Sequence, residues 1–360
     1  MKRVLALLFI CLMVLAVFTG CTQESAPPAT DTPVEETPAE TPDDAVAGIP
    51  LEDIKIGVIF YGTSDDGGWS QSHYTAFLKV KEDLGLSDDQ MILMENVPDQ
   101  GPEPENVLEQ MISEGCNLLF GTSTGHGDAI NNCAARHPDL YFHQFEDTRD
   151  TANVSDFSVR DYEAIFMCGW LAGKMSEGDE LGFVAAQPQS SVVRAINSWA
   201  KGAQYANPDA KVKVVWINSW FDPAADKEAA NALIDEGKTV LGYHGSSSAV
   251  MQAAAERGAY ACGFHIDMQS FAPTAVITSF VWDWAPIYEQ YINNAVAGEW
   301  TRDTMFLGLD AGCATYAPFN ADIVPAEYIE EAKTVEADLK AGKIEVFPTP
   351  VMDNQGKEIL

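Results

Sequence analysis

The chain has 360 residues, 46% of them hydrophobic, and its 54 acidic against 21 basic side chains give a formal net charge of −33. So strong a negative charge argues against nucleic acid or an anionic membrane surface as a partner, because both require a basic binding face. It does not argue against a buried site for a small molecule, since most of these carboxylates are expected to be solvated surface charge.

The N-terminus has the three parts of a secretory signal. Met1-Lys2-Arg3 is basic, residues 4–18 are apolar, and Thr19-Gly20-Cys21 places small residues before a cysteine. The apolar run is shorter than the roughly 18 residues that a membrane-spanning helix needs. We therefore expect a lipoprotein signal at residues 1–20, a lipid on Cys21, and a protein anchored at the extracytoplasmic face of the cell membrane.

Residues 21–48 follow as an acidic segment rich in Pro and Thr and poor in apolar anchors. Such a composition cannot bury enough surface to offset its ordering entropy, and the prolines keep the chain extended. We expect a disordered tether here. The remaining residues, 49–360, are ample for a hydrophobic core and for two lobes.

From residue 52 onward, short β-rich runs alternate with longer helical patterns. Strands are expected at 54–60, 118–120, 141–145, 181–186, 212–217, 240–243, 260–264 and 276–281. Helices are expected at 69–84, 126–137, 162–177, 190–206, 223–236, 248–257, 284–297 and 326–341. Repeated strand-helix units predict an α/β fold of mainly parallel sheets flanked by helices. So many strands exceed what one open sheet usually holds, which favours two lobes.

The cysteines do not predict a metal site or a cofactor. Without Cys11 in the signal and Cys21 as lipid carrier, an odd number remains, which allows at most two bridges and one free thiol. None of them is spaced for zinc, and no two histidines stand four residues apart on a helix. The remaining cysteines are Cys116, Cys133, Cys168, Cys262 and Cys313.

In proteins with open parallel sheets, ligands bind beyond the carboxyl ends of the strands, so the turns after the strands are the candidate binding site. These turns combine aromatic rings, carboxylates, hydroxyls and amides, a mixture that suits a flat, nitrogen-rich ring. The candidate ligand-binding residues are Tyr61, Asp66, Trp69, Ser123, Thr124, Glu146, Tyr162, Gln187, Trp220, His244, Asp267 and Trp282.

Two tryptophans from different lobes would bind such a ring between them. We expect Trp69 on one face and Trp220 or Trp282 on the other, with each stack contributing roughly 1–3 kcal/mol. Glu146 and Asp267 would accept hydrogen bonds from ring N–H or amino groups. The alternative stays open that each tryptophan is only a core residue.

Several of these turns carry motifs of a known family. They are Asp66-Gly-Gly-Trp69-Ser, Phe120-Gly-Thr-Ser123, Asp161-Tyr-Glu163, Asn218-Ser-Trp220-Phe-Asp222-Pro and Gly263-Phe-His-Ile-Asp267. In this order they resemble the basic membrane protein family, substrate-binding lipoproteins of ABC importers associated with purine nucleosides and bases.

The resemblance covers residues 52–350 and implies a two-lobed fold like that of the type I periplasmic binding proteins, with the ligand cleft between the lobes. It also implies an ABC permease as partner. The first lobe is expected at 49–160 and the second at 161–281, with 282–360 crossing over and returning to the first lobe.

Two positions bear on the ligand. Asp267 matches a family aspartate associated with ribose, but the lysine that many members place after a Thr-Ser-x-Val run is replaced by Trp282, which follows Thr278-Ser-Phe-Val281. An indole in place of a cation removes a partner for ribose hydroxyls and adds a stacking face. We therefore expect a free purine base, such as adenine, in preference to a nucleoside.

Two functions other than purine capture for import have features of this sequence in their favour. A sensory lipoprotein would use the same hinged receptor to present ligand to a membrane protein. A serine hydrolase would use Ser123, because Gly121-Thr-Ser123-Thr-Gly125 fits Gly-x-Ser-x-Gly. The stretch from His244 to Ser246 that resembles an oxyanion hole follows this serine, whereas hydrolases place it before. We therefore expect a binding protein and not an enzyme.

Overall fold

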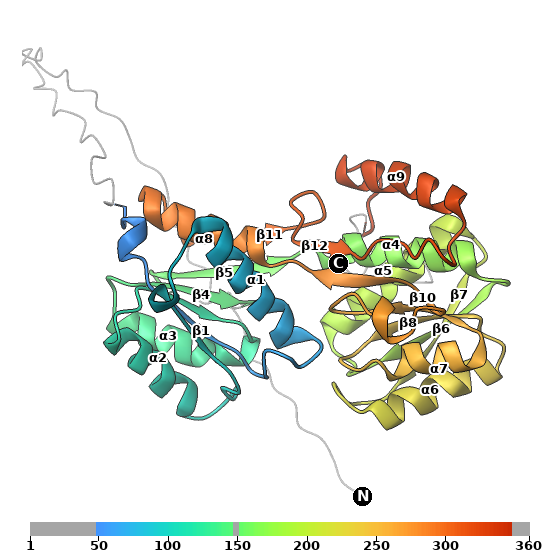
Figure 1. Cartoon of the computed structure of the whole chain (residues 1–360), viewed down its shortest axis with the longest axis horizontal. Helices are drawn as coiled ribbons and strands as arrows, with labels where there is room; N and C mark the ends of the chain where they lie inside the picture. Colours follow the sequence, from blue (N-terminus) through green and yellow to red (C-terminus); the bar gives the residue numbers. More distant parts are fainter. Residues whose placement is uncertain (1–47, 147–150, 348–360) are drawn as a thin grey trace, which may run out of the picture. The chain divides into compact units, whose positions relative to one another are not determined.

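The computed structural model describes residues 48–146 and 151–347, which form two six-stranded sheets with helices packed on them (Figure 1). The expected signal, lipidated cysteine and tether lie outside the described residues. The first sheet has the strand order β11-β5-β4-β3-β1-β2, and all its strands are parallel. Its strands are β1 (Ile56–Ile59), β2 (Met91–Met94), β3 (Leu118–Gly121), β4 (Tyr141–Phe145), β5 (Val154–Val159) and β11 (Met305–Leu307).

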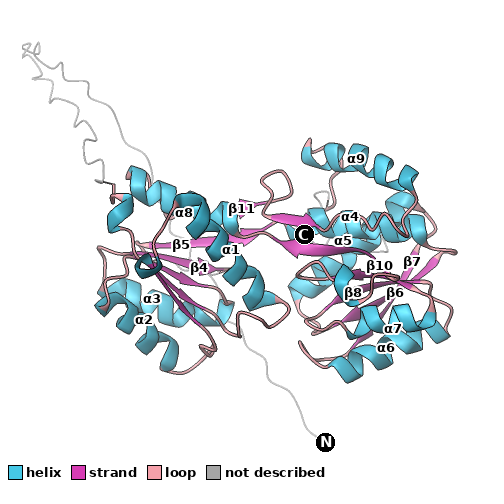
Figure 2. Cartoon of the chain, in the orientation of Figure 1, coloured by secondary structure: helices cyan, strands magenta, loops and turns pink. Residues whose placement is uncertain are grey.

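Helices cover both faces of this sheet, as parallel strands require. The central strands β1 and β3 are buried at every position. Alternate residues belong to two separate apolar clusters, with Val58 in one and Ile59 in the other. Figure 2 shows α1 and α8 over one face and α2 and α3 over the other. These helices are α1 (Trp69–Leu84), α2 (Glu103–Ser113), α3 (Gly127–Arg136) and α8 (Ala285–Ala297).

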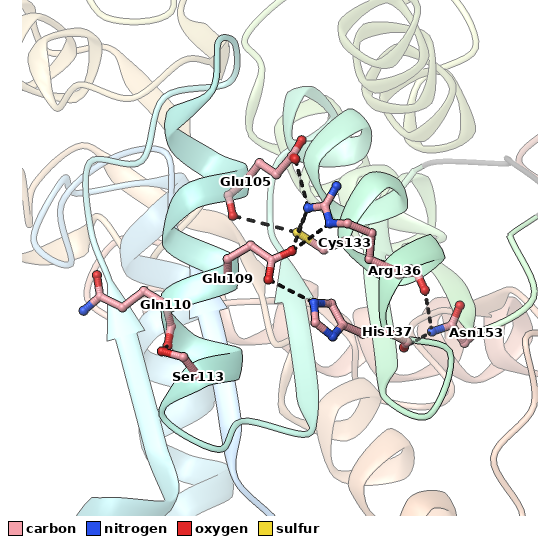
Figure 3. A network of polar contacts seen from close by, with 9 residues as sticks. Glu105, Glu109, Gln110, Ser113, Cys133, Arg136, His137 and Asn153 are labelled. Atoms are coloured by element: carbon pink, nitrogen blue, oxygen red, sulfur yellow. Dashed lines mark hydrogen bonds and ion pairs between the residues drawn. The ribbon is translucent and has the colours of Figure 1, made fainter.

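A polar network holds α2 against α3 (Figure 3). Oε1 of Glu109 accepts hydrogen bonds from Nε and Nη2 of Arg136, at 3.0 and 2.7 Å, and Oε2 lies 2.9 Å from Nε2 of His137. Arg136 also pairs with Glu105 at 2.9 Å, and Nδ2 of Asn153 donates to the carbonyl oxygen of His137 at 2.9 Å. The network therefore ties two surface helices to the chain just before β5.

The second sheet has the order β12-β10-β9-β8-β6-β7 and is parallel except for the β10–β12 pair. Its strands are β6 (Glu180–Ala185), β7 (Lys211–Trp216), β8 (Val240–His244), β9 (Tyr260–Gly263), β10 (Val276–Trp282) and β12 (Ala314–Tyr316). Its helices are α4 (Asp161–Met175), α5 (Ser190–Ala206), α6 (Pro223–Asp235), α7 (Ala249–Arg257) and α9 (Ala326–Lys340). Short 3₁₀ helices lie at Leu51–Asp53, Asp88–Gln90, Thr124–His126 and Gln269–Phe271.

Glycines allow α4 and α5 to meet backbone to backbone. A Cβ on Gly169 would lie 2.0 Å from the carbonyl oxygen of Trp199, and a Cβ on Gly202 would lie 2.0 Å from that of Phe166. Both contacts are far below van der Waals distance, so only glycine fits at these crossing points. This close packing buries almost the whole length of α4.

The predicted α/β fold of two mainly parallel sheets is confirmed. The sequence prediction omitted β2, β5, α2 and the three-residue strands β11 and β12. Within the segment expected to cross over and return, β11 joins the first sheet, whereas β12 pairs with β10 and α9 packs on α4 of the second. The lobe limits at residues 160 and 281 stay a prediction.

The five cysteines of the described residues are all free and buried, so none of the bridges that the cysteine count allows is present there. None of the helices in residues 48–146 and 151–347 combines the length and apolar character needed to cross a membrane.

Candidate ligand-binding site

The carboxyl ends of the parallel strands present the turns that the sequence singles out. The first sheet contributes the turns after β1, β3 and β4, and the second contributes those after β6, β7, β8, β9 and β10. Because parallel strands end at the same edge of a sheet, each set of turns gathers at one edge.

Asp66 organises the turn that leads into α1. Its Oδ1 accepts hydrogen bonds from the backbone N–H of Gly68 at 2.8 Å and of Gln71 at 3.0 Å, and its Oδ2 accepts from that of Ser70 at 2.9 Å. The carboxylate thus satisfies N–H groups that a helix start leaves unpaired. Asp66, predicted to bind ligand, has a capping role here that fixes the position of Trp69, the first residue of α1.

Trp69 lies at the centre of an aromatic cluster. Its Nε1 donates to the carbonyl oxygen of Thr122 at 3.0 Å, and its ring centroid lies 5.4 Å from that of Trp282, with the ring planes at 87°. The two predicted stacking residues therefore touch each other edge to face in this conformation. They form a corner rather than the two parallel walls of a sandwich.

Trp282 is held by two neighbours that the sequence prediction did not include. Its ring stacks on Trp284, with centroids 4.9 Å apart and planes at 15°, and its Nε1 donates to Nδ1 of His265 at 2.8 Å. Trp284 in turn stacks on His73 at 4.3 Å and donates from Nε1 to Oγ of Ser72 at 3.0 Å. The motif Trp282-Asp-Trp284 was visible in the sequence and would have indicated the stacked pair.

Two buried histidines present neutral rings beside this cluster. Burial is the main cause that lowers the pKa of His244 to about 3, and electrostatic interactions with His265 and Arg194 also lower it. Burial lowers the pKa of His265 to about 3. Nδ1 of His244 is buried and has no hydrogen-bond partner among the described residues. His265 has φ of +74°, a left-handed conformation that is strained for a residue with a Cβ. Neutral imidazoles suit hydrogen bonds to an uncharged ring.

The other predicted residues lie at the rim of these turns. Tyr61, Thr124, Glu146, Trp220 and Asp267 are exposed. The ring of Trp220 lies 6.1 Å from that of His244, measured between centroids, and this is its link to the aromatic cluster. The polar groups bond locally: Oγ of Ser123 accepts from the N–H of Gly125, Oε1 of Glu146 accepts from Ser158, Nε2 of Gln187 donates to the carbonyl oxygen of Asn218, and Oδ1 of Asp267 accepts from the N–H of Gln269.

Tyr162 has a different setting. It lines a cavity of about 370 Å³ together with Arg160, Glu163, the end of α9 and several residues of the segment after it, and its ring meets that of Phe347 edge to face at 5.4 Å. Among the described residues, the ring of Tyr162 makes no contact with the rings of the aromatic cluster.

Comparisons with known proteins agree with this architecture. The family model described as ABC transporter substrate-binding protein, PnrA-like, matches residues 53–347. A purine-binding protein of Brucella abortus is 35% identical over 309 residues, which cover 86% of this chain and 87% of that protein. A putative ABC transporter glucose-binding protein of Haloferax volcanii is 30% identical over 312 residues, which cover 86% of this chain and 78% of that protein.

Solved structures support the fold. An ABC transporter solute-binding protein of Conexibacter woesei superposes with a TM-score of 0.70 at 22% identity, over 81% of this chain and 98% of that one. The resemblance seen in the sequence motifs and the expected fold like that of type I periplasmic binding proteins are thereby confirmed.

The family consists of binding proteins, so the expectation of a non-enzyme is confirmed, and the family gives no support to a hydrolytic role for Ser123. Such proteins capture a small molecule outside the cytoplasm and work with a membrane permease. This chain belongs to the family of PnrA-like substrate-binding proteins of ABC transporters.

Proposed function

We propose that the protein captures a purine for an ABC permease, with the free base favoured over the nucleoside and adenine as the first base to test. The single observation that carries this proposal is the aromatic corner formed by Trp69 and Trp282 at the strand ends, bordered by the neutral ring of His265. The 35% identity to a purine-binding protein supports the same ligand class.

The corner suggests a binding mode that differs from a sandwich. One indole would serve as a parallel platform for the base and the other as a perpendicular wall, two arrangements that aromatic rings favour. Glu146 and Asp267, both exposed and at strand ends, are the proposed acceptors for ring N–H and amino groups. Trp220 would cover the base from the rim.

The proposal includes the site of action. We propose that residues 1–20 are removed as a signal, that Cys21 carries lipid, and that residues 21–48 tether the two sheets to the extracytoplasmic face of the membrane. Mass spectrometry of the protein isolated from membranes tests this: a diacylated N-terminal cysteine is expected, and an intact N-terminal methionine contradicts the proposal.

Isothermal titration with adenine, adenosine and glucose tests the ligand. We expect adenine to bind more tightly than adenosine, and Trp282→Ala to weaken adenine binding by about 1–3 kcal/mol because it removes one aromatic surface. Trp300→Ala is the matched control, since that indole stacks at 4.6 Å on Tyr141, at the amino end of β4 and so away from the turns of the candidate site. A much tighter adenosine complex refutes the preference for a base.

A sugar is the second candidate ligand, favoured by the 30% identity to a putative glucose-binding protein. Aromatic faces and carboxylates also bind sugars, so the glucose titration decides between the two classes. Binding of glucose without binding of any purine would replace the first proposal by the second.

A further inference from the structure

Arg194 is a cation at the strand ends that the sequence prediction did not include. It lies in the first turns of α5, shortly after the turn at Gln187 that follows β6. Its Nε lies 3.0 Å from Oδ1 of Asp161, the first residue of α4, whose side chain is only 5% exposed. The two atoms are not aligned as a hydrogen bond, so the pair is held mainly by charge.

The guanidinium of Arg194 retains unused donors. The other arginine at a strand end, Arg160, donates to Glu163, to the carbonyl oxygen of Phe306 and to Asp310, each at 2.6 Å. Arg194, by contrast, pairs only with Asp161 among the described residues, and its side chain is 30% exposed. A guanidinium has five N–H donors and no acceptor, so most of its hydrogen-bonding capacity is available to a ligand.

The fold places Arg194 near the proposed ligand-binding residues, because the first turns of α5 follow the carboxyl end of β6, at the same edge of the second sheet as the turn after β8 that contains His244. The carboxylate of Glu146, at the end of β4, is close enough to act on both Arg194 and Asp161. On the other side, the positive charge of Arg194 adds to burial in lowering the pKa of His244, at the end of β8. Arg194 thus lies within electrostatic reach of groups from both sheets.

A planar donor fork selects ligands with two adjacent acceptors. The O6 and N7 atoms of a 6-oxopurine form such a pair, and this edge is the one that arginine most often recognises in guanine. Adenine offers N7 but has an amino group at position 6, whose hydrogens would face the hydrogens of the guanidinium. The N1–H of a 6-oxopurine is in addition a donor for a carboxylate such as Glu146.

We propose that Arg194 binds the O6/N7 edge of the purine, so that the preferred base is a 6-oxopurine such as hypoxanthine rather than adenine. This inference rests on the proposed capture of a purine base and narrows it to one class of base. Arg194 acts here as a specificity-determining residue in direct contact with the ligand.

Calorimetric titration of the purified protein with hypoxanthine and with adenine tests the inference without any substitution. We expect hypoxanthine to bind at least about tenfold more tightly, because one well-placed arginine fork discriminates by that order. Equal binding, or tighter binding of adenine, overturns the inference and leaves purine capture standing. Absence of binding by any purine base or nucleoside overturns purine capture itself.

Arg194→Lys provides the second measurement. Lysine keeps a positive charge beside the buried Asp161, so the fold is retained, but it lacks the planar fork. We expect the preference for hypoxanthine over adenine to fall by about tenfold, whereas Lys201→Met, which removes an exposed cation from the same helix, leaves the ratio unchanged. An unchanged ratio in Arg194→Lys overturns the role of the fork.

Discussion

Three buried histidines predict that the protein loses stability between pH 8 and pH 5.5. Burial lowers the pKa of His143, His244 and His265 to about 3 each. In the unfolded chain a histidine titrates near 6.5. Between these values the unfolded state binds protons that the folded state does not, so the free energy of unfolding falls as the pH falls.

The magnitude follows from the two pKa values. At pH 5.5 an unfolded histidine with a pKa of about 6.5 is protonated to about nine tenths, which stabilises the unfolded state by about 1.4 kcal/mol per residue. The folded histidines stay neutral at this pH. Three such residues lower the free energy of unfolding by about 4 kcal/mol relative to pH 8, a large part of the stability of an ordinary domain.

Urea unfolding followed by circular dichroism at pH 8.0 and pH 5.5, at constant ionic strength, measures this difference. Carboxyls whose pKa burial raises, such as those of Asp161 and Asp226, act in the opposite direction, so a variant isolates the histidine contribution. His143→Gln should reduce the pH-dependent difference by about 1.4 kcal/mol, whatever its own cost at pH 8. Equal free energies of unfolding of the wild type at both pH values, together with an unchanged difference in the variant, would refute the reasoning.

Three further predictions concern single features. Asp66→Ala should lower the free energy of unfolding, measured with urea, by about 0.5–2 kcal/mol, because it removes the cap of α1, and it should weaken ligand binding because Trp69 is then less well positioned. Asp66→Asn should lose less of this free energy, and equal losses in the two variants would contradict the capping role. Gly202→Ala should cost about 1–3 kcal/mol, since its Cβ would lie 2.0 Å from the carbonyl oxygen of Phe166 and 2.7 Å from the backbone nitrogen of Trp170, whereas Gly178→Ala, with no atom within 4 Å, should be almost neutral in the same assay. Burial raises the pKa of the Cys116 thiol to about 11 and that of Cys133 to about 12, so iodoacetamide at pH 8 should label these residues only after unfolding, and labelling of the native protein would contradict their burial.

The sequence was sufficient for the elements whose pattern is strong. The central strands are continuous apolar runs, and α1 and α5 have clear helical periodicity, so these were predicted close to their observed bounds. β2 is an apolar run of only four residues that is partly buried, so its sequence did not separate it from the loops around it, and α2 begins beside Pro102 with an acidic, weakly apolar segment. β11 and β12 have three residues each, and only pairing with β5 and β10 makes them strands.

The positions of the candidate residues in the fold could be predicted from the sequence, but their contacts could not, and their role in ligand binding stays a prediction. Topology places the turns after the strands at one edge of each sheet, so the sequence alone was enough to assign Trp69, His244 and Trp282 to such turns. The capping role of Asp66 was not, because a carboxylate before a helix has the same sequence pattern whether it binds backbone or ligand. Arg194 was omitted because it lies within a helical pattern, and only its ion pair with Asp161 reveals its setting.

The strand order has a consequence for synthesis and export. β5 remains an unpaired edge until β11, about 150 residues later, has left the ribosome or the translocation pore, and β10 likewise waits for β12. The first sheet takes its last strand from beyond five strands of the second sheet, so its native pairing depends on a contact of long sequence separation that forms slowly. A chain emerging from its N-terminus therefore stays incompletely folded until its last quarter appears. A chain that is not yet folded can pass through a membrane channel. Until β11 appears, the backbone groups at the free edge of β5 can pair with another chain, so this edge is where a chaperone would protect it.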